Sequence, residues 1–191
     1  MDLIYRQIED SIVVKKLILE DKVIQKLIKE AAAVCCKSLR KGNKIIFAGN
    51  GGSAADAQHL AGELINRFGF ERPGLAAIAI TTDTSILTSI SNDYGFDNLF
   101  ARQIEAIGKK GDVLISLSTS GNSANILQGI KEAKKAGIVT IGLTGKSGGK
   151  MKNLCDLILR VPSGDTPRIQ EAHILIGHII CSSVENTLFG K

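Results

Sequence analysis

The chain has no tryptophan, only three prolines and few aromatic residues, which make up 4% of its 191 positions. Sites for single-stranded nucleic acid interleave basic residues with aromatic stacking platforms, and the sequence contains no such strip. The 24 basic and 19 acidic residues give a formal charge of +5, and the basic residues are dispersed. We therefore expect no nucleic-acid partner, although a modest positive charge helps to attract an anionic metabolite.

Long apolar runs and C-x-x-C pairs are also missing. No stretch approaches the about 20 apolar residues of a membrane span, and acidic residues at positions 2, 9 and 10 do not suit a signal peptide. The four cysteines, at positions 35, 36, 155 and 181, have mostly apolar neighbours. Such reduced, buried thiols are typical of intracellular proteins, so we expect a cytoplasmic protein with no membrane partner.

Five β-rich runs alternate with helix-like segments from residue 44 onward. They cover residues 44–49, 75–80, 112–117, 138–143 and 156–161. This alternation predicts an α/β fold, in which a five-stranded parallel sheet carries helices on both faces. A last helix is expected from about Pro167 to Phe189, because proline is tolerated in a first helical turn.

Residues 3–40 have apolar side chains at helical spacing, which predicts one or two amphipathic helices before the first strand. Their apolar stripes must be buried on the chain's own sheet or on a partner subunit, and the pattern does not decide between these. The predicted division is an N-terminal helical segment over 1–41 and a single domain over 42–191.

Two of the expected strands end in polar loops. The first is followed by GNGGSAADA, where glycines permit close backbone approach and Ser53 is a candidate helix cap. The third leads into LSTSGNSANI, where hydroxyl groups crowd a helix start whose free amides and dipole favour an anion. Such residues are often only capping and turn residues, but that role explains six polar or glycine residues in a row poorly. We therefore expect phosphate binding at residues 116–123. A dinucleotide is not expected, because neither G-x-G-x-x-G nor a Walker A motif is present.

His59 and Glu63 lie four residues apart on the helix after the first loop, so they share a face and can converge on one ion or substrate. In the last helix, Gln170 lies about 80° from His178 around the axis, whereas His173 points away from His178 by about 140°. His178 is therefore the better partner, although a lone histidine on an apolar helix is more often a core residue.

Spacing does not choose between Gln170 and Glu171 as a further member of this cluster, because Glu171 lies nearer to the face of His178. The sequence leaves both residues open. Two histidines, a glutamate and an amide oxygen would suit zinc, and other divalent ions are not excluded.

These residues occur in stretches that resemble the sugar isomerase (SIS) domain proteins and, more closely, the bacterial phosphoheptose isomerases. The resemblance covers nearly the whole chain. It rests on AGNGGSAADAQHLAGEL, ERPGLAAIAI, SNDYGFDNLFARQIEA, STSGNSANI, LTGKSGGKM and TPRIQEAHILIGHII, in that order. SIS membership rests mainly on STSGNS, and the narrower assignment rests on the histidine and glutamate positions with the last helix.

The resemblance implies a single SIS-type domain in a homotetramer, with residues 1–41 as an oligomerisation segment and active sites shared between neighbours. It implies one zinc ion per subunit, bound by the residues that match His59, Glu63, Gln170 and His178. The implied substrate-binding residues are Asn50, Gly51, Gly52, Glu63, Asn92, Asp93, Ser118, Thr119, Ser120, Ser123 and Gln170. Arg67 and Asp165 are weaker candidates.

The implied reaction converts D-sedoheptulose 7-phosphate to D-glycero-D-manno-heptose 7-phosphate, towards ADP- or GDP-heptose for lipopolysaccharide or capsule. It moves a proton from C1 to C2, which requires a base and an acid. Glu63 is expected as the base and His178 as the acid, with zinc as a Lewis acid. Because metal binding lowers the basicity of a carboxylate, we hypothesise that Glu63 leaves the metal when substrate arrives.

Two other functions are compatible with the resemblance. A close relative of these isomerases is a non-enzymatic scaffold that binds the replication initiator protein, but a scaffold needs no metal site, and this chain keeps all four candidate ligands. A sugar-phosphate sensor would normally carry a DNA-binding module, which residues 3–40 do not resemble. The sequence therefore favours the enzyme.

Overall fold

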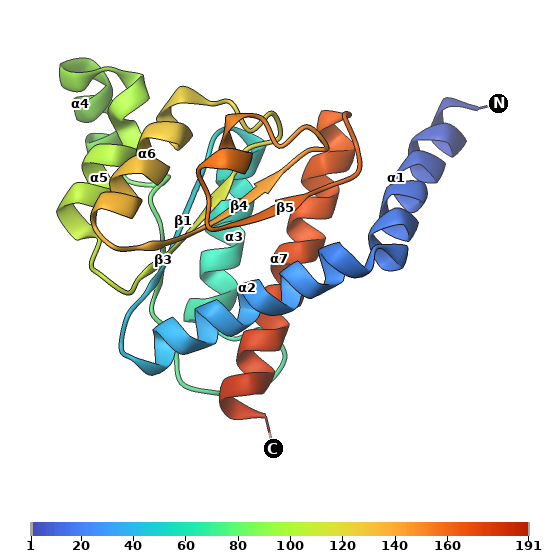
Figure 1. Cartoon of the computed structure of the whole chain (residues 1–191), viewed down its shortest axis with the longest axis horizontal. Coiled ribbons are helices and arrows are strands. Elements are labelled where there is room, and N and C mark those ends of the chain that lie inside the picture. The colour runs from blue at the N-terminus through green and yellow to red at the C-terminus, as the bar shows by residue number, and fades with distance from the viewer. Residues whose placement is uncertain (1, 191) are drawn as a thin grey trace.

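The strands pair in parallel, as predicted, and form one sheet. In the computed structural model, which describes residues 2–190, the sheet order is β2-β1-β3-β4-β5 (Figure 1). The strands are β1 (Ile45–Gly49), β2 (Ala77–Ala79), β3 (Val113–Leu117), β4 (Val139–Thr144) and β5 (Leu157–Arg160). β2 is shorter than the predicted run 75–80, because it is an edge strand that pairs only with three residues of β1.

Helices cover both faces of the sheet. They are α1 (Leu3–Glu20), α2 (Lys22–Arg40), α3 (Gly52–Ile65), α4 (Thr84–Tyr94), α5 (Leu99–Ile107), α6 (Ala124–Lys135) and α7 (Thr166–Phe189), with 3-10 turns at Phe96–Asn98 and Lys150–Asn153. Ile45 and Phe47 of β1 belong to a core with α2, α3 and α7, whereas Ile46 and Ala48 belong to a second core with α5 and α6. The prediction of an α/β sheet with helices on both faces is confirmed.

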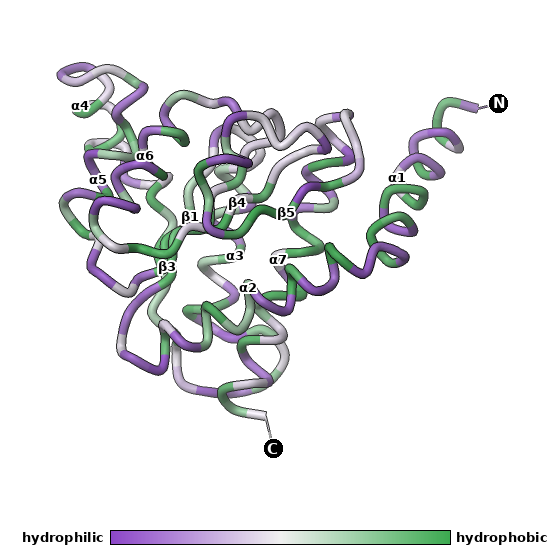
Figure 2. Tube along the Cα trace, in the orientation of Figure 1, coloured by the Kyte–Doolittle hydropathy of each residue, from purple (hydrophilic) through white to green (hydrophobic). Residues whose placement is uncertain are grey.

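The two N-terminal helices bury their apolar faces differently. Asp21 caps α2, accepting hydrogen bonds from the amides of Val23 (2.8 Å) and Ile24 (3.1 Å), and α2 then packs on the chain's own core. By contrast, α1 projects from the body and keeps an apolar face exposed (Figures 1 and 2). The exposed large apolar side chains on α1 are Leu3, Ile4, Tyr5, Ile8, Ile12, Val13, Leu17 and Leu19. The domain boundary between residues 41 and 42 stays a prediction.

The last helix, α7, begins at Thr166 with Pro167 in its first turn, as predicted. It packs against both α2 and α3, and its buried side chains join the core on that face of the sheet. Near its start, the guanidinium of Arg168 donates to the carbonyl of Gln7 (2.6 Å), which ties α1 to α7. No helix within residues 2–190 is long and apolar enough to cross a membrane.

His173 on α7 makes folding depend on pH. Its side chain is fully buried, and burial lowers the pKa of the imidazole to about 4. The unfolded chain takes up a proton on this residue near pH 6.5 and the folded chain does not. The stabilisation is therefore complete above about pH 6.5 and is lost as the pH falls towards 4, by about 3 kcal/mol.

Urea unfolding of the metal-free protein at several pH values within that window checks this expectation. Because other groups also titrate in acid, the comparison is with a His173→Gln variant, which lacks the imidazole. We expect the free energy of unfolding to fall more steeply in the wild type than in the variant. Equal slopes would contradict the assignment to His173.

Candidate active site

The two polar loops predicted from the sequence meet at one edge of the sheet. β1 and β3 are neighbours, with Gly49 opposite Leu117, so the loops that follow them start side by side. From these strands the chain winds in opposite directions, towards β2 on one side and β4 on the other. Parallel α/β folds bind ligands at such a switch point, beyond the carboxyl ends of the strands.

The first loop turns sharply into α3. Gly51 has a φ of 55°, a left-handed conformation that favours glycine, and it occupies the cap position of the helix. The predicted cap, Ser53, is wrong, because the turn at Gly51 starts the helix earlier and leaves Ser53 buried in its first turn. A Cβ atom at Gly52 would collide with the side-chain amide of Gln170. Glycine at this position thus lets Gln170 of α7 lie against the loop.

Asn50 is held by a residue that the sequence analysis did not select. Its Nδ2 donates to Oδ1 of Asn125 (2.8 Å), and Nδ2 of Asn125 donates back to Oδ1 of Asn50 (2.9 Å). Asn125 is buried at the start of α6. Asn125 falls within the STSGNSANI stretch, but no local pattern indicates a partner 75 residues away. This reciprocal pair links the first loop to the second.

The second loop gathers its hydroxyl groups at the start of α6. Ser123 precedes the helix without capping it, and its Oγ lies 3.2 Å from Oγ of Ser118. Gly121 has a φ of 65°, and its carbonyl accepts a hydrogen bond from the amide of Met151 (3.1 Å). The amide of Gly145 donates to the carbonyl of Thr119 (3.0 Å). The segment after β4 therefore fixes the shape of this loop.

His59, Glu63 and His178 converge. His59 Nε2 lies 2.9 Å from His178 Nε2 and 3.0 Å from Glu63 Oε1, and one ligand atom from each residue falls within 4.8 Å of the others. Ligand atoms around a tetrahedral zinc ion lie about 3.3 Å apart when the bonds are about 2.0 Å long. Nitrogen and carboxylate oxygen are also suitable zinc ligands. The three residues therefore form a group that can hold a metal ion.

Three further polar residues, Gln170, Glu171 and Asp56, differ in their hydrogen-bond partners. Oε1 of Glu171 accepts a hydrogen bond from Arg168 (2.6 Å), whereas its Oε2 is buried without a hydrogen-bond partner among residues 2–190. Gln170 lies at the first loop. Asp56, one turn before His59 on α3, has a carboxylate oxygen that is buried without a hydrogen-bond partner in the described part of the chain. Burial raises the pKa of Asp56, and His59 opposes this shift.

Four predicted residues lie away from the group. Asn92 and Asp93, at the end of α4, are exposed and bonded to each other (2.7 Å), and they line an open hollow beside Ser85 and Ser89. Arg67 is exposed and pairs with Glu71 (3.3 Å), and the side chain of Asp165 does not cap α7. Among residues 2–190 no hydrogen bond or ion pair joins any of these four to His59, Glu63 or His178.

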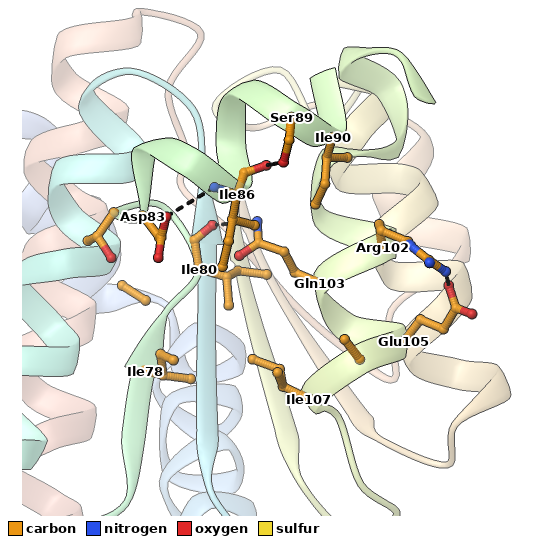
Figure 3. A pocket seen from close by; sticks show the side chains of 13 residues that line it. Ile78, Ile80, Asp83, Ile86, Ser89, Ile90, Arg102, Gln103, Glu105 and Ile107 are labelled. Atoms are coloured by element: carbon orange, nitrogen blue, oxygen red, sulfur yellow. Dashed lines mark hydrogen bonds and ion pairs between the residues drawn. The ribbon is translucent and has the colours of Figure 1, made fainter. Parts of the chain in front are cut away.

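A separate hollow of about 750 Å³ lies between β2, α4 and α5 (Figure 3). Its walls include the aliphatic side chains of Ile78, Ile80 and Ile107, and none of the predicted site residues lines it. Its polar side chains are largely paired, since Gln103 donates to the carbonyl of Ile80 and Arg102 pairs with Glu105. This hollow does not suit a sugar phosphate.

Comparison with known proteins agrees with the geometry. A sequence model of the SIS domain matches residues 14–145. Phosphoheptose isomerase 2 of Campylobacter jejuni is 62% identical over 182 residues, which cover 95% of this chain and 90% of that protein. The chain belongs to the phosphoheptose isomerase family of SIS domain proteins.

Solved structures of phosphoheptose isomerases share this fold along their whole length. The structure from Neisseria gonorrhoeae has a TM-score of 0.89 and 43% identity, covering 96% of this chain and 97% of its own. The structure from Francisella tularensis has a TM-score of 0.92 and 39% identity, covering 96% of both chains. The predicted SIS-type fold and membership of the phosphoheptose isomerase family are confirmed.

Proposed function

We propose that this protein is an isomerase that converts D-sedoheptulose 7-phosphate to D-glycero-D-manno-heptose 7-phosphate. The observation that carries the proposal is the convergence of His59, Glu63 and His178, two of them on α3, the helix that starts at the first loop of the switch point. High identity to proteins named phosphoheptose isomerase over almost the full chain supports it. The initiator-binding scaffold is not favoured, because these relatives are named as enzymes.

In the proposed reaction the carboxylate of Glu63 takes a proton from C1, the electron pair of that C–H bond forms a C1=C2 double bond, and the π pair of the C2=O2 carbonyl moves onto O2. His178 acts from the other side as the acid that returns a proton at C2, where the C1=C2 pair forms the new C–H bond. The hydroxyl proton on O1 passes to O2 as the C1=O1 carbonyl forms, so the formula is unchanged and the ketose becomes an aldose. Glu63 then releases its proton to solvent and His178 takes one up. Both side chains are partly exposed, which leaves room for substrate beside them.

We propose one zinc ion per subunit, held by His59, Glu63, Gln170 and His178. The donor set, and the spacing of His59, Glu63 and His178, fit the ion. Gln170 is included through the family resemblance, and it lies against Gly52 of the first loop. The chemistry that zinc supplies when bound is Lewis-acid polarisation of the substrate's carbonyl and hydroxyl oxygens.

The remaining candidates would hold the ends of the sugar phosphate. Ser118, Thr119, Ser120 and Ser123 offer hydroxyl groups to the phosphate, and Asn50, Gly51 and Gly52 offer amides and a side chain to the sugar. Asn92 and Asp93 belong to the proposal through the family resemblance, with Arg67 and Asp165 as weaker members.

We also propose that the protein forms a homotetramer in which segment 1–41 packs between subunits and neighbours complete the site. The exposed apolar face of α1 supports this, because such faces are normally buried. A cytoplasmic location completes the proposal. All four cysteines are free, which suits a reducing compartment.

Turnover of sedoheptulose 7-phosphate by the purified protein tests the function. We expect activity to fall at least about tenfold on chelation, to return when zinc is restored and to be absent in a His178→Ala variant. No turnover by a well-folded, zinc-supplied tetramer would contradict the proposal and favour the scaffold or the sensor. Unchanged activity after complete metal removal would contradict the metal requirement alone.

A further inference from the structure

A buried ion pair joins the segment after α3 to α7, and the proposed chemistry does not use this pair. Arg72 Nε donates to Glu185 Oε1 at 3.0 Å, and each side chain is only 1% exposed. Removing two charges from water is costly, so a buried pair is weak evidence for stability and is better explained by a structural specificity that it imposes. The contacts of Arg72 and Glu185 indicate which parts of the structure the pair holds in place.

Arg72 holds the end of α3. Its two terminal guanidinium nitrogens donate to four carbonyls, those of Glu63 (2.9 Å), Leu64 (2.7 Å), Asn66 (3.1 Å) and Pro73 (3.0 Å). The last carbonyls of a helix have no hydrogen-bond donors within the helix. Here the guanidinium donates hydrogen bonds to some of these carbonyls. The backbone of the predicted base, Glu63, is thus fixed by the same group that contacts α7.

Glu185 holds the loop that touches His178. Its two carboxylate oxygens accept from the amides of Phe68 (2.8 Å) and Gly69 (2.7 Å) as well as from Arg72. Glu185 lies seven residues, about two turns, after His178 on α7, so the two share a face. The rings of Phe68 and His178 have their centroids 5.6 Å apart. Burial disfavours ionisation of Glu185, but these donors hold its pKa below the usual value.

We propose that Arg72 and Glu185 are positioning residues, which fix Glu63 on α3 and His178 on α7 relative to each other through the loop that carries Phe68. The inference rests on the proposed function, because it concerns the geometry of the same base and acid. Catalytic groups displaced by about 1 Å can lose about 100-fold in rate. Outer residues that orient metal ligands typically affect metal affinity by about 10- to 100-fold.

The test uses Glu185→Gln in the full-length protein, with Glu105→Gln as the matched control. Glu105 forms an ion pair of 2.7 Å with Arg102, but both side chains are about half exposed and lie on α5. The readouts are the Kd for Co²⁺ measured by chelator competition, and kcat and KM with sedoheptulose 7-phosphate. Circular dichroism first establishes conditions in which each variant is folded.

In Glu185→Gln we expect the Kd for Co²⁺ to rise at least about tenfold and kcat to fall by about 10- to 100-fold. KM should change little, because no hydrogen bond or ion pair among residues 2–190 joins the loop after β3 to Arg72 or Glu185. The control should match the wild type in all three quantities. A folded Glu185→Gln protein with wild-type Kd and kcat would overturn the inference and leave the pair with a merely structural role.

If Glu185→Gln does not fold, a Phe68→Leu variant decides the question, because it removes the ring beside His178 and leaves the buried charges in place. A raised Kd for Co²⁺ supports the inference, and wild-type Kd and kcat overturn it. Failure of the proposed function would give a result that differs from failure of this inference. The wild type would then bind Co²⁺ without isomerising the sugar phosphate, while the Kd comparison would still decide the role of the pair.

Discussion

A Glu63→Gln variant should lose turnover by about 100- to 10,000-fold, the range that a positioned general base contributes. Glutamine has the shape of glutamate but cannot accept the C1 proton at neutral pH. The decisive measurement is exchange of the C1 hydrogen with solvent deuterium, followed by NMR alongside kcat. We expect both to fall together, because exchange and turnover start with the same proton transfer.

Two comparisons separate loss of the base from loss of the fold or the metal. Glu105→Gln makes the same change in an exposed ion pair on α5 and should retain full activity. The Kd for Co²⁺ of Glu63→Gln shows how much of the defect comes from weaker metal binding. Full turnover in Glu63→Gln would remove Glu63 as the base and leave it, at most, as a metal ligand.

Gly177→Ala is expected to damage the site without changing any of the proposed metal ligands. A Cβ atom at Gly177 would lie 2.5 Å from both terminal methyl groups of Leu60, which is itself buried. These two residues adjoin His178 and His59, so the close packing of α7 on α3 brings the imidazoles together. An added methyl group should reduce the free energy of unfolding by about 1–3 kcal/mol. It should also weaken Co²⁺ binding by at least about tenfold.

Gly62→Ala supplies the matched control for this change. Gly62 lies on α3 two residues after Leu60, and a Cβ atom there would meet nothing within 4 Å. Because glycine is unfavourable inside a helix, this substitution should stabilise the protein by up to about 1 kcal/mol and leave the Kd for Co²⁺ unchanged. Urea unfolding and chelator competition measure both effects. Equal behaviour of the two alanine variants would contradict a packing role for Gly177.

Much of the fold could be predicted because the inner strands are apolar on both faces. The predicted run 112–117 corresponds to β3 (Val113–Leu117) almost residue for residue, since a strand covered on both faces is typically a short, continuous apolar run. Helix geometry likewise places His59 and Glu63 on one face. These predictions depend on local spacing, which the sequence contains directly.

Features that depend on distant partners could not be predicted. The Asn50–Asn125 pair and the Arg72–Glu185 pair join residues 75 and 113 positions apart, and neither has a local signature. The amphipathic pattern of residues 3–40 correctly predicted helices. It did not show that α2 packs on the chain's own core whereas α1 stays largely uncovered. The position of Gln170 against Gly52 also depends on how α7 docks.

The chain order of the site has a consequence for biosynthesis. His59 and Glu63 leave the ribosome before Gln170, His178 and Glu185, which all belong to α7. A nascent chain therefore contains half of the proposed metal group but cannot close it until α7 has emerged. Because α7 also packs on α2 and α3, its docking closes the core on this face of the sheet and brings His178 to His59 in one step. The proposed metal group therefore forms together with the tertiary core.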